Sequence, residues 1–473
     1  MPQLVLLLLG VPYLRKRWKG LFAAGLFFLV AGVFVFIDAL DNALYFPLNA
    51  FAVLFIIEGL ATLMIATTGV GGQRVLRYVK GLFVLLAGSL ILAGHHHGHF
   101  ALSMIFGALF LTDGVLQCLA AYVVRYERWR YAFAGGITEI MLAIFFFQPY
   151  PTNYVGTVPY CVGLFLGIAG VKLLWLARRV KHLASNPAFA SNASPDFLPS
   201  EPASASAPAS NANAALAPRP PGPTVWDGPP ADSEPALTVH VWTPSGSAKA
   251  QTRNLPLVDR YIAAVDINGV ISTGHAALES PEGIYISLYP RDEIDRSPDE
   301  FGNLLRATAE NDIPGVYQPD YPTESKAWCP STVRVRFRNY DAQKLADFWQ
   351  DYRQNSTYNL THRNCSSSVA RALDAALDGV VGRLHGSQAG GRVLLRLLLT
   401  PELWVASQIR KRALTMAWTP GLTLDYARAM SMLADPRPFG WWKMSQLALR
   451  RIAALRANWR QQDRDAPLRR PPV

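Results

Sequence analysis

The chain has 473 residues, of which 51% are hydrophobic and 17% are charged, and its formal net charge is +11 at pH 7. About a quarter of the residues in a typical soluble domain are charged, so this composition excludes an ordinary soluble protein of two or three domains. Most of the apolar residues precede Lys181. The sequence therefore predicts a membrane part followed by a soluble part.

The first apolar stretch, Leu4-Val-Leu-Leu-Leu-Leu-Gly10, has the composition of a signal-peptide core. Its basic cluster, residues 15–19, follows the stretch rather than precedes it, and no cleavage site of small residues is present, so we do not expect cleavage. About ten apolar residues are too few to cross the hydrocarbon layer. We expect a helix that lies in the membrane interface.

Six longer apolar runs are candidates to cross a bilayer. They are Gly20–Phe36, Phe46–Ala66, Gly81–Gly94, Phe100–Val123, Tyr131–Phe147 and Val155–Ala177, the third extending back through Tyr78 and Val79. Lys and Arg collect at residues 15–19, 74–80, 125–130 and 178–181, and the loops at the opposite ends carry none. By the positive-inside rule, the N-terminus and everything after the sixth run face the cytoplasm.

The six runs also show an internal repeat. Lys19-Gly-Leu-Phe recurs as Lys80-Gly-Leu-Phe, and the even-numbered runs carry Glu58-Gly59, Asp113-Gly114 and Ala169-Gly170. We expect three tandem helical hairpins within a membrane domain of residues 1–183. Residues 15–180, with these short glycine-rich runs, resemble the HdeD family of bacterial inner-membrane proteins, and the resemblance implies that location.

Some polar residues inside the membrane part need an explanation. Glu58, Asp113 and Glu139 fall within the runs, where they would either form an ion path or lie near the interfaces or hydrogen-bonded between packed helices. His95-His-His-Gly-His99 has suitable chemistry for Zn²⁺ or Ni²⁺, but no carboxylate or cysteine nearby completes a site. We expect adventitious affinity there, and neither a metal ion nor a cofactor in the function.

Residues 184–236 predict a disordered linker. Ala, Ser, Pro and Asn dominate, and this composition cannot bury enough apolar surface to offset the chain entropy. The following soluble domain, residues 237–385, alternates apolar and polar residues at 237–242, 271–279, 283–289 and 333–338, and helical periodicity marks residues 341–353. The predicted fold class is multi-domain: an all-α polytopic membrane bundle and an α+β domain.

Cys365 is the first candidate for chemistry. Val369, Ala370, Leu373 and Leu377 recur at the spacing of an amphipathic helix, so Cys365 should occupy its first turn. There the helix dipole favours a thiolate over a thiol. The alternative is a buried structural cysteine. A base for the thiol is available at His275, which lies in a predicted strand.

These two segments together resemble a known family. Gly-His-Ala-Ala-Leu at residues 274–278 and Tyr-Asn-Leu-(x)3-Asn-Cys at residues 358–365 are similar to the circularly permuted papain-like thiol enzymes related to NlpC and to lecithin:retinol acyltransferase. The resemblance implies that Cys365 is the nucleophile and His275 the general base. It further implies that Ser287 orients the imidazole and that Tyr358 helps to bind the oxyanion.

The C-terminal region, residues 386–473, is basic and predicted to be amphipathic and helical. Its apolar segment 390–409 is interrupted by charged residues and Pro401, so we expect either a helix in the headgroup region of an anionic leaflet or a helix packed on the bundle. The positive charge indicates membrane lipid rather than nucleic acid as the acidic partner, since no nucleic-acid module is recognisable. An assembly of several copies is compatible with the sequence.

The four cysteines fit this topology. Cys118 and Cys161 lie in the apolar runs, and Cys329 and Cys365 lie in the soluble domain. In the cytoplasm the last two remain thiols, whereas a disulfide between them would disable the nucleophile.

The function predicted is a membrane-anchored cysteine hydrolase or acyltransferase, acting through an acyl-enzyme on an amide or ester of a protein or lipid near the membrane. A cytoplasmic domain disfavours peptidoglycan as the substrate. Two alternatives stay open. In one, the thiol domain is an inactive binding module on a membrane anchor, and in the other the bundle is the working part, a stress-response membrane protein that the soluble domain regulates.

Overall fold

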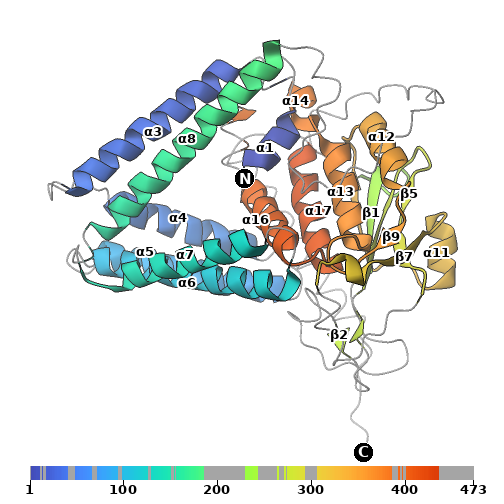
Figure 1. Cartoon of the computed structure of the whole chain (residues 1–473), viewed down its shortest axis with the longest axis horizontal. Helices are drawn as coiled ribbons and strands as arrows, with labels where there is room; N and C mark the ends of the chain where they lie inside the picture. Colours follow the sequence, from blue (N-terminus) through green and yellow to red (C-terminus); the bar gives the residue numbers. More distant parts are fainter. Residues whose placement is uncertain are drawn as a thin grey trace, which may run out of the picture.

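The protein has a helical N-terminal region and a separate region that contains a small sheet (Figure 1). The computed structural model describes residues 2–10, 13, 17–40, 48–66, 72–93, 98–125, 129–150, 154, 156–185, 230–242, 264–265, 271–272, 274–292, 306–385, 393–394, 397 and 401–435. Most of the predicted linker, the start of the histidine run at 95–97 and the basic tail from 436 on lie outside the described residues.

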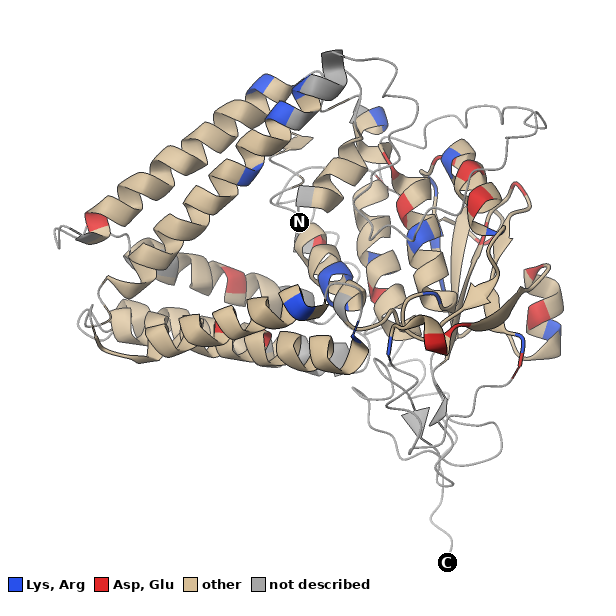
Figure 2. Cartoon of the chain, viewed as in Figure 1, with Lys and Arg blue, Asp and Glu red and all other residues tan. Residues whose placement is uncertain are grey.

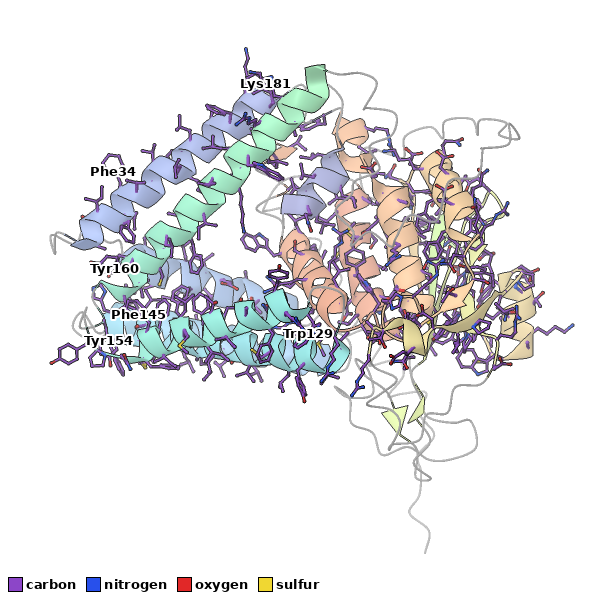
Figure 3. All side chains as sticks on the ribbon, in the orientation of Figure 1. Phe34, Trp129, Phe145, Tyr154, Tyr160 and Lys181 are labelled. Carbon is purple, nitrogen blue, oxygen red and sulfur yellow. The ribbon has the colours of Figure 1, made fainter. Side chains whose placement is uncertain are left out.

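Each of the six apolar runs forms a helix. These are α3 (Trp18–Leu40), α4 (Leu48–Ala66), α5 (Gly72–Ala93), α6 (Gly98–Val124), α7 (Trp129–Phe147) and α8 (Thr157–Ser185). Four of them, α3, α6, α7 and α8, are long and apolar enough to cross a membrane, whereas the apolar parts of α4 and α5 are shorter, Ala52–Leu63 and Gly81–Ala93. Large apolar side chains cover their outer faces, and Phe34 points away from the bundle (Figure 3).

The helices do not pack as the expected tandem hairpins. The extensive contacts are between α4 and α5, between α6 and α7, and between α3 and α8, so the first helix pairs with the last (Figure 1). Glycines form each contact. A Cβ built on Gly32 would meet the backbone of α8, and one built on Gly114 would meet the backbone of α7. Close backbone approach at small residues is the usual basis of helix pairing in membranes. The glycine contacts therefore determine which helices pair, and these pairs differ from the ones that the sequence repeat predicted.

The sheet-containing region is built on one antiparallel sheet with the order β5-β4-β1-β8. Its strands are β1 (Leu237–Trp242), β4 (His275–Glu279), β5 (Tyr285–Ile286) and β8 (Val333–Phe337). A second sheet joins β6 (Leu288–Pro290), β7 (Ile313–Tyr317) and β9 (Thr357–Tyr358), and β2 (Ala264–Val265) pairs with β3 (Ile271–Ser272). The alternating strands predicted from the sequence are therefore present.

Helices complete this region. They are the short 3-10 helix η2 (Ala309–Asn311), then α11 (Tyr321–Ala327), α12 (Ala342–Tyr352), α13 (Cys365–Leu377), α14 (Val380–His385), α16 (Pro401–Thr415) and α17 (Pro420–Ala434). The predicted helices at 341–353 and after Cys365 agree closely with α12 and α13. Helix α11 lies at the edge of the region farthest from the bundle (Figure 1).

The core of this region does not end at residue 385. Helix α17 packs on β1, β4 and β8 beside α13, and its Leu424 and Met430 are buried in the same hydrophobic cluster as Val239 and Leu373. The boundary expected at 385 is therefore wrong for α17. The basic composition of residues 386–473 concealed this apolar helix face, which the sheet needs as a cover.

Helix α1 (Pro2–Leu9) is also part of this core. Leu4, Leu8 and Leu9 are buried against α13, α14 and α16, and the Gly379 amide donates a hydrogen bond to the Leu7 carbonyl (2.7 Å). The expected interfacial helix is thus wrong. An apolar helix with no polar face is as well suited to a protein core as to a membrane, and its sequence does not distinguish the two.

For α16, the structure selects one of the two alternatives. The helix packs on α17 and on α6, and its Lys411 and Arg412 form ion pairs with Asp113 of α6. Packing on the bundle is therefore observed for this part of the C-terminal region.

Candidate active site

Cys365 is the first residue of α13, at the helix end that favours an anion. Asn364 caps the helix, because its side chain accepts a hydrogen bond from the Ser367 amide (2.8 Å) while the Ser367 hydroxyl accepts one from the Asn364 amide (2.8 Å). The Asn364 side-chain amide also donates to the Leu360 and Trp418 carbonyls. This capping fixes where the helix starts. The polar Asn-Cys-Ser-Ser-Ser sequence is therefore the signal of a helix N-terminus.

The loop before Cys365 is fixed by a buried arginine. Arg363 stacks over the Tyr352 ring at 4.0 Å and donates to the Tyr352 and Asn355 carbonyls. Asn359 forms a bridge with Arg363 across the turn. The backbone is thus held in place both before Cys365, by the loop contacts, and after it, by the capped helix.

His275 opens β4 and pairs in register with Trp242 of β1. Its Nε2 atom lies 2.8 Å from the Ser287 hydroxyl and 3.2 Å from Oε1 of Glu324. Cys365 lies near enough to this imidazole and to the Ala276 amide for both to favour its anion. The structure thus brings Cys365, His275 and Ser287 together.

Glu324 is the residue that the sequence did not reveal. It is almost fully buried on α11, and its carboxylate accepts hydrogen bonds from the Tyr289 hydroxyl (2.7 Å) and the Tyr285 hydroxyl in addition to its contact with His275. Helix α11 has seven residues, too few to show a periodic pattern. The only local signal is the cap, where the Asp320 side chain accepts from the Thr323 amide (2.7 Å), and it indicates a helix start rather than a site.

These contacts decide the charges at the site. Burial opposes the imidazolium, but the Cys365 sulfur and the Glu324 carboxylate outweigh it and raise the pKa of His275 to about 9. Burial also opposes the thiolate, yet the pKa of Cys365 is lowered because His275 and the Ala276 amide stabilise the anion. For Glu324, hydrogen bonds from His275 and the two tyrosines overcome burial and lower the pKa to about 2. These shifts favour the thiolate of Cys365 and the imidazolium of His275 over the neutral pair.

Tyr358 lies on β9, where it pairs with Ile313 of β7 and is buried. Its assignment to the oxyanion stays a prediction. The cysteines are free thiols, Cys329 exposed and Cys365 only 7% exposed. The thiol needed for chemistry is therefore available and largely shielded from water.

Aromatic rings surround the imidazole. Tyr289 stacks on His275 with ring centroids 4.1 Å apart, and Trp242 lies at 5.4 Å. Trp328 stacks on Trp242 at 5.7 Å and contacts His275 edge to face, yet it is 53% exposed. The indole ring of Trp328 thus connects the surroundings of His275 to the protein surface.

Comparisons with models of known protein families, with curated proteins and with solved structures found no match. A cysteine at a helix N-terminus, a histidine beside it and a buried carboxylate behind the imidazole together suit nucleophilic attack on a carbonyl carbon.

Proposed function

We propose that this protein is a membrane-anchored cysteine hydrolase or acyltransferase that acts through a thioester on Cys365. The observation that carries the proposal is the buried series Cys365, His275 and Glu324 at the N-terminus of α13. The same order of nucleophile, base and orienting carboxylate recurs in enzymes of unrelated fold. Cys365 and His275 are the nucleophile and base that the resemblance to permuted papain-like enzymes implies, whereas Glu324 is not part of that resemblance.

In the first step, the Cys365 thiolate attacks the carbonyl carbon of an amide or ester and a tetrahedral oxyanion forms. As this collapses, the His275 imidazolium donates its proton to the leaving amine or alcohol, and the thioester remains. In the second step, neutral His275 accepts a proton from water or from an acceptor amine or hydroxyl, which attacks the thioester and releases Cys365.

The supporting residues have separate roles in this scheme. Glu324 and Ser287 both contact Nε2 of His275, so they fix the orientation of the ring, and the carboxylate stabilises the imidazolium. The amides of Cys365 and Ser366 at the start of α13, with Tyr358, are proposed to bind the oxyanion.

The proposed location is the bacterial inner membrane, with all six helices α3–α8 crossing it and the sheet-containing region in the cytoplasm. Lys and Arg gather at the ends of α3 and α8 nearest that region, and the long middle parts of the bundle carry little charge (Figure 2). Trp129 and Tyr154 lie at opposite ends of the bundle, as expected of residues at the two interfaces (Figure 3). A protein or lipid near the inner leaflet is the substrate class that this location favours.

The test uses the full-length protein in membranes of known sidedness, labelled with iodoacetamide from about pH 5 to pH 9, with each cysteine measured by mass spectrometry. The exposed Cys329 is an internal control for access of the reagent to the sheet-containing region. We expect Cys365 to react near pH 6 and from the cytoplasmic face, and His275→Ala to slow this reaction by about two orders of magnitude.

Two outcomes would contradict the proposal. If Cys365 stays unreactive up to the ordinary thiol value of about pH 8.5, the enzyme hypothesis fails and a binding module takes its place. Labelling of Cys365 from the periplasmic face would reverse the proposed topology and make peptidoglycan a candidate substrate again.

A further inference from the structure

Helix α16 carries three consecutive basic residues that reach in different directions. Arg410 is buried and its Nη2 lies 3.0 Å from Oδ2 of Asp374 on α13, the helix that begins with Cys365. The Tyr426 hydroxyl of α17 donates to the same carboxylate. Because consecutive helix residues are about 100° apart, Arg412 projects from nearly the opposite side of α16. One helix can therefore contact two partners at once.

The second partner is the membrane helix α6. Nζ of Lys411 lies 3.0 Å and Nη2 of Arg412 lies 2.8 Å from the two carboxylate oxygens of Asp113. Glu139 of α7 is adjacent, since its Cβ would be 3.1 Å from a Cβ built on Gly114, and its Oε2 is buried without a hydrogen-bond partner among the described residues. Two neighbouring carboxylates in a membrane bundle are costly unless cations face them. Here both cations come from α16.

A second contact joins α6 to the loop before Cys365. The Ala307 amide donates to the Val124 carbonyl at the end of α6 (2.7 Å). The next residue, Thr308, accepts from the side chain of Asn359, which also donates to Asp312 (2.7 Å) and forms the bridge with Arg363. Helix α6 is thus connected to both the body of α13 and the segment that leads into it.

We propose that α6 and α16 couple the membrane bundle to the thiol site, so that a change in how α6 packs in the bundle alters the position of α13 and the reactivity of Cys365. Asp113 of α6 forms this contact with Lys411 and Arg412 of α16. A displacement of α16 then reaches α13 through the ion pair of Arg410 with Asp374. Such coupling requires that these packed elements can adopt a second arrangement, which both sites then favour or oppose.

The test compares Asp113→Asn, the pair Lys411→Met with Arg412→Met, and all three changes together, in the full-length protein in nanodiscs. Hydrogen exchange of α13 amides is the first readout and does not require any enzyme activity. The second is the rate of Cys365 alkylation. We expect each variant to speed α13 exchange by about tenfold, and the combined variant to add little more, because contacting residues are not additive.

Two further variants control for general destabilisation. Asp113→Glu keeps a carboxylate and should retain the exchange rate of the unmodified protein. Asp232→Asn removes another carboxylate that lies between two arginines, Arg334 and Arg336, away from α16, and should leave α13 unchanged. Unaltered α13 exchange in the Asp113→Asn variant, or fully additive effects in the combined one, would overturn the coupling. Faster exchange with Cys365 unreactive in every variant would instead keep the coupling and refute the proposed enzyme.

Discussion

The bundle and the sheet-containing region hold their helices together by opposite means. Between α3 and α8, glycines bring backbone against backbone, and bulky apolar side chains face outward. Around α13, buried polar groups such as Asn364, Arg363 and Glu324 are hydrogen-bonded to defined partners. Complementary shape therefore determines the helix contacts in the bundle, whereas hydrogen-bond partners determine the geometry of the site. Small changes in volume should damage the first, and small changes in polarity should damage the second.

The largest effect should come from a single methyl group in the bundle. In Gly170→Ala the new Cβ would meet the backbone of Leu29 on α3, so we expect a loss of about 1–3 kcal/mol in the free energy of unfolding. Gly167→Ala on the same helix is the matched control, since nothing lies within 4 Å of its Cβ. Unfolding in mixed micelles measures both, and equal stability of the two variants would contradict glycine-based packing.

A nearly isosteric change should perturb the site mainly through charge. Glu324→Gln removes the carboxylate that raises the pKa of His275, so that pKa should fall from about 9 toward its ordinary value and the thiolate should lose its partner at lower pH. The midpoint of the pH profile for Cys365 alkylation should move to higher pH. The pH range in which the thiolate and the imidazolium coexist should become narrower at both its lower and its upper limit. Labelling at pH 6 should decrease by about tenfold.

Two controls define that result. Tyr289→Phe removes one donor to Glu324 but keeps the carboxylate, and its pH profile should move less. Glu310→Gln changes an exposed acid on η2 and should leave the profile in place. A Glu324→Gln profile identical to that of the unmodified protein would show that Ser287 alone orients the imidazole.

The smallest effect should come from the exposed wall of the site. Trp328→Ala should leave alkylation by iodoacetamide unchanged but slow alkylation by a benzyl-substituted iodoacetamide by about threefold, because the aromatic contact is lost. Trp404→Ala, on the outer face of α16, removes an equally exposed indole and serves as the control. If the Trp328→Ala variant reacts with both reagents as fast as the unmodified protein does, this ring does not contact the reagent.

The sequence predicted those features that depend on local pattern. Apolar periodicity located α13 and placed Cys365 at its first turn. It did not reveal which bundle helices pair, because mean hydropathy carries no partner information and only the spacing of glycines such as Gly163 and Gly170 does. Glu324 was missed since a seven-residue helix has no measurable period and its carboxylate meets His275 only through tertiary contact. The predicted interfacial location of α1 was wrong because an all-apolar helix can be buried in a protein core as well as in a membrane.

The burial of α1 has a consequence for synthesis. Its partners around Gly379 are made some 370 residues later, which at ribosomal rates of about 5–20 residues per second leaves α1 unpaired for about 20–75 s. During that time six apolar helices emerge and the leucines of α1 have no protein surface to cover them. The thiol site therefore matures last, after the bundle, and a fragment that begins at the linker would lack one wall of its own core.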